Sequence, residues 1–343
     1  MSPTGSAFDA IIVGARVAGS AAAIALGRTG LRVLLVDKAA FPSDTLSTHI
    51  VLSGGAQVLE RLGALELLER QGGVRYSRMR TVGPGFDYSV ELRDSVRVLR
   101  GLCLTRLKMD ATMLGAVRDL ANVTVREQFL VKDLVIEDGA VIGIRGADVS
   151  GEHEFRAPLT VGADGMRSTV AKIASERIGA FARTEVPCAR AYYYAYFDRV
   201  PLERFGDELL TEFAPEHGAA SLACRCDGDR VVAACAFDAR ALHQFRTDLL
   251  PNLRRQLEAT PGIARTLADA SVASKVLSSG FLANTYRVPV ADGAILIGDA
   301  GLHADPLFGQ GHSLALMSVE ILAELAPQWF AEGRARDAIP ATA

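Results

Sequence analysis

The sequence predicts an α/β fold in which a Rossmann-like domain is combined with a second, mostly antiparallel β-sheet. Three observations predict it. A strand, a glycine turn, a helix and a second strand follow one another near the N-terminus, a buried strand of the same kind returns near the C-terminus, and aromatic, strand-like segments lie between them. At 343 residues, the chain is also longer than one compact domain usually is.

The first predicted unit consists of two buried strands joined by a helix. Residues 10–13 (AIIV) form a short apolar run, and residues 17–28 are rich in Ala and Leu, with Gly30 as the helix stop. Residues 31–36 (LRVLLV) predict the second buried strand. A strand, a helix and a strand in such a short stretch predict a βαβ unit with parallel strands.

The turn between the first strand and the helix carries a variant of a phosphate-binding fingerprint. In G-x-G-x-x-G, the first glycine makes the tight turn, the second lets the backbone approach a pyrophosphate, and the third lets helix and strand pack closely. Gly14 and Gly19 keep this spacing, but Arg16 stands at the second position, where its side chain either crowds a pyrophosphate or turns away and reaches an anion. Asp37 ends the second strand, where an acid is expected to bind the adenosine ribose hydroxyls.

Two later motifs also follow predicted strands. Asp164-Gly165 lies in residues 161–168 (VGADGMRS), at a strand-to-helix junction, and Gly298-Asp299 is followed by residues 305–311 (DPLFGQG), which open a long helix. An Asp there can accept hydrogen bonds from ribityl or ribose hydroxyls, and the helix N-terminus can face a group that becomes anionic. Either motif alone is equally compatible with a plain turn, because Gly and Asp dominate turns.

The remaining elements follow from periodicity and turn signals. Helical spacing is found in residues 53–69, 107–120, 167–175 and 310–330, while residues 123–145 hold three short β-like runs. From about residue 183 to 289 the chain is rich in strands, with a helix near residues 249–257. Alternation places Tyr192, Tyr194 and Tyr196 on one face, which either lines a pocket or packs as an ordinary sheet. We therefore assign the second domain to residues 76–99 and 183–289, and the Rossmann-like domain to residues 1–75, 100–182 and 290–343.

Composition and charge exclude several classes of protein. The net charge is −3 and no run of Lys and Arg suggests contact with nucleic acid. The first apolar stretch, residues 11–26, lacks a basic segment before it and contains Arg16, so it predicts neither a signal peptide nor a membrane span. We expect a cytoplasmic protein with no nucleic-acid partner and no membrane span; the sequence does not indicate an oligomeric state.

The cysteines predict neither a disulfide framework nor a metal site. There are five, an odd number, and they are scattered. Cys224 and Cys226 have no second pair and no nearby His to complete a tetrahedral set, so we predict no metal. We interpret the two as strand residues on alternate faces.

Taken in order, the motifs resemble those of the flavoprotein monooxygenase superfamily with the p-hydroxybenzoate hydroxylase fold, to which geranylgeranyl reductases and flavin-dependent halogenases are related. The resemblance covers most of the chain and includes Arg106, which matches a family arginine that opens a helix. It implies a Rossmann-like FAD-binding domain and an antiparallel substrate domain. It also implies that FAD is bound by Gly14, Arg16, Ala18, Gly19, Asp37, Lys38, Thr48, Arg106, Val131, Asp164, Gly165, Gly298, Asp299, Pro306, Gly309, Gln310 and Gly311.

The resemblance further implies a reaction. NAD(P)H, bound transiently, reduces FAD, molecular oxygen adds to the reduced flavin, and a flavin hydroperoxide hydroxylates an aromatic or polyketide-like small molecule. Pro306 is expected near the flavin edge, and His49 and His303 are candidates for proton transfer, against the ordinary structural role of a histidine. The catalytic candidates are therefore His49 and Pro306.

Three alternatives remain open within this resemblance. A flavin-dependent halogenase is disfavoured because the W-x-W-x-I-P signature is missing and the one tryptophan is Trp329. A flavin-dependent reductase of isoprenoid-type double bonds would use the same scaffold. A non-catalytic FAD-binding protein is the third alternative. The departures from the family pattern are Arg16 in place of glycine and a chain that ends soon after the last predicted helix, where relatives often continue.

Overall fold

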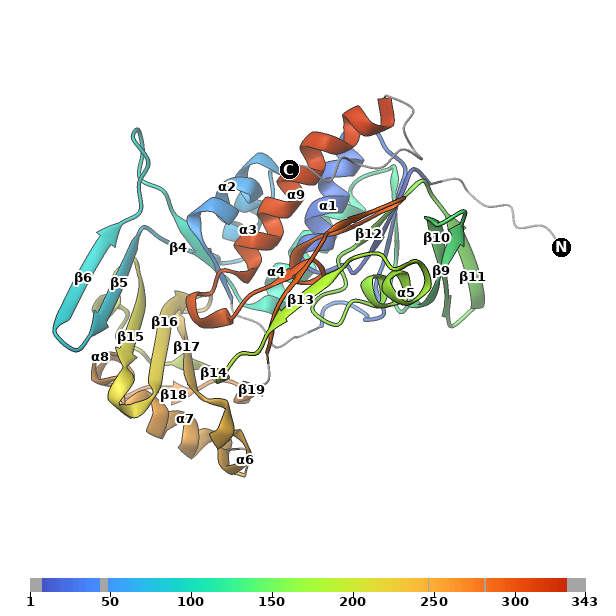
Figure 1. The fold of residues 1–343 in the computed structure, drawn as a ribbon. Helices are drawn as coiled ribbons and strands as arrows, with labels where there is room; N and C mark the ends of the chain where they lie inside the picture. Colours follow the sequence, from blue (N-terminus) through green and yellow to red (C-terminus); the bar gives the residue numbers. More distant parts are fainter. Residues whose placement is uncertain (1–7, 44–48, 246, 281, 332–343) are drawn as a thin grey trace.

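The computed structural model describes residues 8–43, 49–245, 247–280 and 282–331. It confirms the α/β fold: one sheet carries helices α1, α4 and α9 on one face, and a second, larger sheet lies beside it with its own layer of helices (Figure 1). Both sheets are built from segments far apart in the sequence. The described residues that position the candidate site lie where the two sheets approach each other.

The first sheet has six strands in the order β21-β22-β12-β1-β2-β8. All of its pairs are parallel except β21 with β22, so the carboxyl ends of five strands meet at one edge. In an open sheet of this kind, ligands bind beyond that edge. The strands are β1 (Ala10–Val13), β2 (Val33–Val36), β8 (Val123–Arg126), β12 (Leu159–Gly162), β21 (Val290–Ala291) and β22 (Ala294–Leu296).

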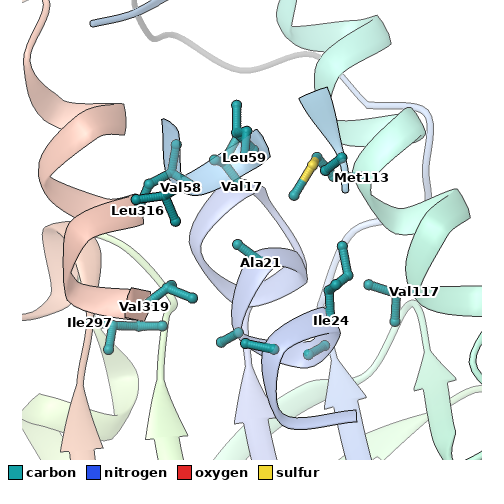
Figure 2. Close-up of a cluster of buried hydrophobic side chains, with 14 of the residues drawn as sticks. Val17, Ala21, Ile24, Val58, Leu59, Met113, Val117, Ile297, Leu316 and Val319 are labelled. Atoms are coloured by element: carbon teal, nitrogen blue, oxygen red, sulfur yellow. The ribbon is translucent and has the colours of Figure 1, made fainter. Parts of the chain in front are cut away.

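Helix α1 (Val17–Arg28) has the same bounds as the predicted helix and lies at the centre of the largest core. Figure 2 shows α1 side chains between those of α9 (Gly311–Ala331) and α4 (Arg106–Arg118). Burial of this apolar surface is the main force that holds the helices on the sheet. The segment predicted as one helix from residue 53 to 69 is two, α2 (Ser53–Arg61) and α3 (Leu65–Arg70), because Gly63 adopts φ +58° between them.

The opposite face of the first sheet is covered by an antiparallel three-stranded sheet and one helix. The sheet contains β9 (Leu130–Glu137), β10 (Ala140–Asp148) and β11 (Gly151–Arg156). Helix α5 (Thr169–Ile178) packs against β9. It starts where the Ser168 hydroxyl accepts a hydrogen bond of 3.0 Å from the amide of Ala171.

The second sheet has eight strands and confirms the predicted, mostly antiparallel architecture. Its order is β18-β14-β17-β16-β15-β5-β6, with β19 paired to β14, and only β15 and β5 are parallel. Helices α6 (Leu242–Phe245), α7 (Leu249–Glu258) and α8 (Pro261–Thr266) lie along one side of it (Figure 1). The strands are β5 (Arg78–Gly83), β6 (Phe86–Glu91), β14 (Arg190–Asp198), β15 (Glu208–Ala214), β16 (Ala219–Cys226), β17 (Arg230–Asp238), β18 (Ser271–Val272) and β19 (Leu277–Ser279).

The two faces of this sheet differ in what they contact. Tyr193 joins the core under α7, whereas Tyr194 and Tyr196 point to the other face, into a separate cluster. Cys224 and Cys226 both belong to that second cluster, so the prediction of alternate faces is wrong: residues two apart in a strand share a face. The tyrosine side of the sheet therefore faces the Rossmann-like part of the chain.

Two small sheets complete the described structure. One joins β3 (Ile50–Val51), β7 (Gly101–Cys103) and β4 (Val74–Tyr76), and the other joins β13 (Arg183–Val186), β20 (Asn284–Arg287) and β23 (Leu302–His303). The domain division given above stays a prediction. Within the described ranges, short 3-10 helices are found at Leu202–Arg204, Pro215–His217, Ala239–Ala241, η4 (Gly298–Ala300) and η5 (Pro306–Phe308).

Helix α9 is the single helix of the described residues that is long and apolar enough to cross a membrane. Such a length is also common in core helices. One side of α9 packs on α1 and α2, through Leu316, Val319 and Leu322 among others. The expected cytoplasmic location stays a prediction.

Candidate cofactor and substrate site

The turn after β1 is shaped by two glycines. Gly14 adopts φ +105°, and a Cβ there would lie 2.4 Å from the carbonyl oxygen of Ala163. A Cβ on Gly19 would lie 1.7 Å from the carbonyl oxygen of Gly14. No side chain fits at either position, so both glycines are required for the close packing of turn, helix and neighbouring strand.

Asp37 fixes the turn from the end of β2. Its Oδ2 accepts a hydrogen bond of 2.7 Å from the amide of Ala15, and its Oδ1 accepts one of 2.8 Å from the amide of Ala39. The carboxylate is buried, whereas the neighbouring Lys38 is exposed. Asp37 therefore lies beside the fingerprint turn, as the sequence predicts.

The N-terminus of α1 is open to an anion. Arg16 occupies the N-cap, its side chain does not cap the helix, and the first turn contains no acidic residue. The amide groups of Val17 and Ala18 have no preceding turn of helix to accept their hydrogen bonds. These groups and the helix dipole favour a negatively charged group at this point.

Arg106 is the first residue of α4, as expected for the family arginine. It is 4% exposed, and its Nη2 lies 3.0 Å from both carboxylate oxygens of Asp110. Its Nε is buried without a hydrogen-bond partner in the part of the chain that the structure describes. Arg106 thus retains an unused donor.

Asp164 lies in the turn after β12. Its Oδ2 accepts hydrogen bonds from the amides of Thr169 (2.6 Å) and Val170 (3.3 Å), while its Oδ1 is buried with no partner among the described residues. Burial raises the pKa of Asp164, although the hydrogen bonds to Ser168 and Thr169 act against this. Gly165 follows with φ +81°.

Asp299 lies in η4, directly after β22. Gly298 adopts φ +57°, and a Cβ there would lie 3.2 Å from the Cβ atoms of Ala18 and Ala315, so this turn fits between α1 and α9. Burial raises the pKa of the Asp299 carboxyl. Its Oδ1 would lie 3.9 Å from a Cβ on Gly311, the first residue of α9. The acid and the helix N-terminus therefore face the same region.

The loop from residue 304 to 311 leads from Asp299 into α9. Pro306 opens η5, and Gly309 ends it with φ +64°, next to the side chain of Ile50 in β3. Gln310 is half-buried between Gly309 and the start of α9. His312 then binds the carbonyl of Ile50 through Nδ1 at 3.2 Å. The start of α9 is thereby fixed against β3.

His49 lies directly before β3 and faces the second sheet. It is 1% exposed, and its ring centroid lies 5.1 Å from that of Tyr194 and 4.9 Å from that of Tyr196. Neither ring nitrogen has a partner within the described ranges. Burial, followed by the charge of Arg106, lowers the pKa of His49 well below its usual value, so the imidazole is neutral at pH 7.

His49 borders a small cavity between β3 and the second sheet. Its volume of about 10 Å³ is enough for one water molecule. The other lining residues are apolar or aromatic: Ile50, Tyr194, Leu222, Val232 and Ala234.

The remaining predicted residues lie on other elements. Val131 is in β9, in the core on the other side of the first sheet, with Val13 and Val36. His303 lies in β23 and contacts the carbonyl of Ala283 through Nδ1 at 2.7 Å. Thr48 lies outside the described residues.

Sequence reasoning missed three residues of the site. Asp110 follows Arg106 by one helical turn, a spacing that would have predicted their pairing. His312 directly follows the Gly309–Gly311 motif, which was the available signal. Asp305 begins the motif of residues 305–311, but its pairing could not be predicted from the sequence, because its partners Arg190 and Tyr192 are more than 100 residues away.

The orphaned polar atoms fit a large, polar cofactor at the strand ends. Buried atoms of Arg106, Asp164, His49 and His312 all lack partners among the residues described. Such atoms are costly unless a ligand or water satisfies them. These atoms occur together with an open helix N-terminus and with glycines that bring the backbone close to the site. This combination of hydrogen-bonding groups suits a dinucleotide with a diphosphate, ribose hydroxyls and a flavin ring.

Fold and site together define a flavin-dependent oxidoreductase. The chain belongs to the family described as "FAD binding domain", whose model matches residues 7–336, and FAD is its cofactor. It is 27% identical over 331 residues to digeranylgeranylglycerophospholipid reductase 2 of Methanothermobacter thermautotrophicus, covering 95% of this chain and 80% of that protein. It is 25% identical to squalene epoxidase 3 of Arabidopsis thaliana, covering 94% of this chain and 60% of the plant protein.

Solved structures have the same fold. PqsL, a probable FAD-dependent monooxygenase from Pseudomonas aeruginosa, superposes with a TM-score of 0.78 at 20% identity, covering 95% of this chain and 88% of that one. The myxobacterial chondrochloren halogenase CndH gives a TM-score of 0.84 at 21% identity, covering 96% and 76%. The resemblance inferred from the motifs is confirmed, and the similar proteins comprise monooxygenases, reductases and halogenases.

Proposed function

We propose that this enzyme is an NAD(P)H-dependent monooxygenase that hydroxylates an aromatic or polyketide-like small molecule with molecular oxygen. The observation that carries the proposal is the environment of His49. A neutral imidazole with two unused nitrogens borders an otherwise apolar cavity against Tyr194 and Tyr196. Apolar walls with one convergent polar group are typical of substrate sites. Because the cavity of about 10 Å³ has room for one water molecule, a substrate ring would reach His49 only if the surrounding side chains move.

The residues predicted to bind FAD fall into groups, each of which would contact a different part of the cofactor. The α1 N-terminus, with Arg16 and Arg106, would hold the diphosphate, and Asp37 the adenosine ribose. Asp299 would bind ribityl hydroxyls, and the start of α9 would face the flavin ring. Bound FAD would supply electron transfer from NAD(P)H and the activation of oxygen.

His49 would orient the substrate through a hydrogen bond. A neutral imidazole nitrogen accepts a hydrogen bond from a ring hydroxyl, which raises the electron density of the ring and favours its attack on an electrophilic oxygen. Because the cavity is lined by apolar and aromatic side chains, little water competes for this bond. Pro306, which has no amide hydrogen, would border the flavin in the loop above.

Reduction of an isoprenoid-type double bond is a second candidate function. The observation that favours it is the similarity to the archaeal digeranylgeranylglycerophospholipid reductase over 95% of the chain. Both functions need a reduced flavin, but only hydroxylation consumes oxygen. Oxygen dependence therefore distinguishes them.

The test is anaerobic mixing. FAD-reconstituted protein is mixed with NADPH or NADH while the flavin absorbance is followed, and oxygen is then added with a panel of phenols or polyketides. We expect bleaching by nicotinamide, faster turnover with a panel member, and a product heavier by one oxygen atom. A flavin that no nicotinamide reduces would overturn the proposal, and an isoprenoid substrate reduced without oxygen would establish the second candidate.

Two histidine variants, one at the cavity and one away from it, make the test specific for the cavity. His49→Asn should retain FAD and its reduction by nicotinamide, but lose product formation roughly tenfold, the equivalent of one hydrogen bond in the transition state. His243→Asn, at an exposed position in α6, is the matched control and should behave as wild type. Equal product formation by both variants would exclude a role for His49 in orienting the substrate.

A further inference from the structure

Strand β6 forms the outer edge of the second sheet. It pairs with β5 on one side, and no strand of the described residues pairs with its other side (Figure 1). Phe86, Tyr88 and Val90 alternate along it and are 44%, 53% and 52% exposed. Proteins usually blunt such an edge with lysine, proline or a bulge, and β6 has none of these. An apolar edge strand of this kind is a surface to which another chain adds a strand.

The apolar side chains of β6 are held in a defined arrangement on one face of the strand. The ring of Phe86 lies over Gly83 in β5, where a Cβ would lie 2.3 Å from its Cζ. The ring centroid of Tyr88 lies 6.0 Å from that of Phe86, and Val90 is opposite Met79 of β5. We call Phe86, Tyr88 and Val90 the β6 stripe. Because its side chains are already packed against β5, a partner loses little entropy in ordering them.

The backbone of β6 determines which residues can bond to a partner strand. The amide of Leu92, just after β6, donates a hydrogen bond of 2.7 Å to the carbonyl of Ser77, just before β5. Hydrogen-bonded and non-bonded pairs alternate along an antiparallel ladder, so the residues of the β6 stripe bond to β5. Asp87, Ser89 and Glu91 therefore direct their amides and carbonyls to the free edge.

Charge and strand length restrict how a second β6 strand fits this edge. In a symmetric antiparallel pair, one residue lies opposite itself on the two-fold axis. An axis at Ser89 would place Asp87 opposite Glu91 of the second copy twice, and like charges directly opposite each other destabilise a sheet. An axis at Asp87 would place that acid opposite itself. An axis at Val90 would leave Phe86 opposite the turn that follows β6. All three registers are therefore disfavoured.

We propose that β6 is the contact surface of a homodimer, in which the β6 strands of two copies pair antiparallel about a two-fold axis at Tyr88. In this register Asp87 and Ser89 of opposite copies exchange backbone hydrogen bonds, and the two eight-stranded sheets become one continuous sheet. The dimer is independent of the reaction catalysed, so its failure would leave the proposed monooxygenase activity untouched.

The side chains match in this register on both faces of the joined sheets. On the apolar face, Tyr88 lies opposite its own copy and Phe86 lies opposite Val90, which are favourable aromatic and aromatic–β-branched cross-strand pairs. On the polar face, each Asp87 already forms a two-hydrogen-bond ion pair with Arg80 of its own hairpin, at 2.9 and 2.7 Å. The acids nearest the axis are thus neutralised before the copies meet.

The first test measures association in solution. The FAD-loaded full chain is followed by sedimentation velocity at roughly 1–100 µM, because a contact made by one strand edge lies at the small end of specific interfaces. We expect a monomer–dimer equilibrium. Tyr88→Glu places two like charges at the axis and should weaken dimerisation about tenfold or more. Tyr286→Glu, at a tyrosine in β20 that is also 53% exposed, is the matched control and should associate as wild type. Thermal melting and the flavin absorbance check that both variants fold.

The second test reads the register by cross-linking. It uses a Cys188→Ser background, because the other four cysteines are buried. Tyr88→Cys should give a disulfide-linked dimer on mild oxidation, since the Cα atoms of a non-bonded pair lie about 4.5 Å apart, within the range of a disulfide. Ser89→Cys is the control and should stay monomeric on a non-reducing gel. Phe86→Cys and Val90→Cys should cross-link when mixed, but neither should do so alone.

Three results would overturn the proposal. The first is a chain that stays monomeric over the whole concentration range. The second is a Tyr88→Glu variant that dimerises as tightly as wild type, which would place the contact on another surface. The third is a cross-link formed by Ser89→Cys in place of Tyr88→Cys, which would exclude the two-fold axis at Tyr88.

Discussion

Nε of Arg190 donates a hydrogen bond of 2.8 Å to Oδ2 of Asp305, across 115 positions of the sequence. The same carboxylate accepts the hydroxyl of Tyr192 and, at 3.0 Å, the amide of Leu307. Asp305 directly precedes Pro306, while Arg190 and Tyr192 lie in β14. One carboxylate therefore fastens the loop that is expected to border the flavin to the sheet that is expected to carry the substrate.

Asp305→Asn should loosen this connection. Burial raises the pKa of Asp305, but hydrogen bonds from Tyr192 and Arg190 outweigh this and hold it below its usual value, so the group is ionised at neutral pH. Loss of the charged acceptor should lower the free energy of unfolding by about 1–3 kcal/mol in urea titrations. Asp238→Asn, in an exposed pair with Arg240, is the control and should lose clearly less stability than Asp305→Asn. Equal losses would show that the Asp305 contacts contribute no more than a surface pair.

Gly19→Ala should disrupt the fingerprint turn. The added methyl would lie 1.7 Å from the Gly14 carbonyl oxygen, so the backbone must move. We expect a loss of stability at or above the upper end of about 1–3 kcal/mol, together with weaker FAD binding. Gly115→Ala, in α4 with nothing within 4 Å, should instead stabilise by about 0.5–1 kcal/mol. Thermal melts that rank the two variants in the opposite order would contradict the packing described here.

Stability should fall below pH 6.5 because of His312. Burial, followed by the charge of Arg106, lowers its pKa to about 3, whereas in the unfolded chain a histidine takes up its proton near pH 6.5. The contribution of His312 to the free energy of unfolding is therefore complete above pH 6.5. It is lost as the pH falls towards 3, at up to about 1.4 kcal/mol per pH unit. His312→Gln cannot take up this proton, so its unfolding free energy should depend less steeply on pH between 6.5 and 5. Parallel curves for the two proteins would rule out a buried, neutral His312.

Two residues of α9 should differ sharply on truncation. Leu316 lies in the core between α1 and α2 (Figure 2), and Leu316→Ala should cost about 2–5 kcal/mol of unfolding free energy. Ile321 is 54% exposed on the same helix, and Ile321→Ala should stay within about 0.5 kcal/mol of wild type in aqueous buffer. A large loss at Ile321 would mean that this face of α9 is covered in solution.

Local patterns predicted much of the scaffold. The bounds of α1 were predicted because an apolar run between two glycine turns has few other conformations, and Asp37 and Arg106 were placed by their position at the end of a strand and the start of a helix. The break between α2 and α3 was missed, because a helical spacing continues across Gly63 and its positive φ is not visible in the pattern.

The sequence by itself determined the class of protein, since the ordered motifs at the ends of strands are short-range features that each follow from backbone geometry and glycine content. Only the tertiary structure decided how those motifs are completed. It placed Arg16 on Asp110, Asp305 on Arg190, and His49 against Tyr194 and Tyr196. These contacts join residues about 100 positions apart or more, so they depend on how the two sheets pack together and not on any local periodicity.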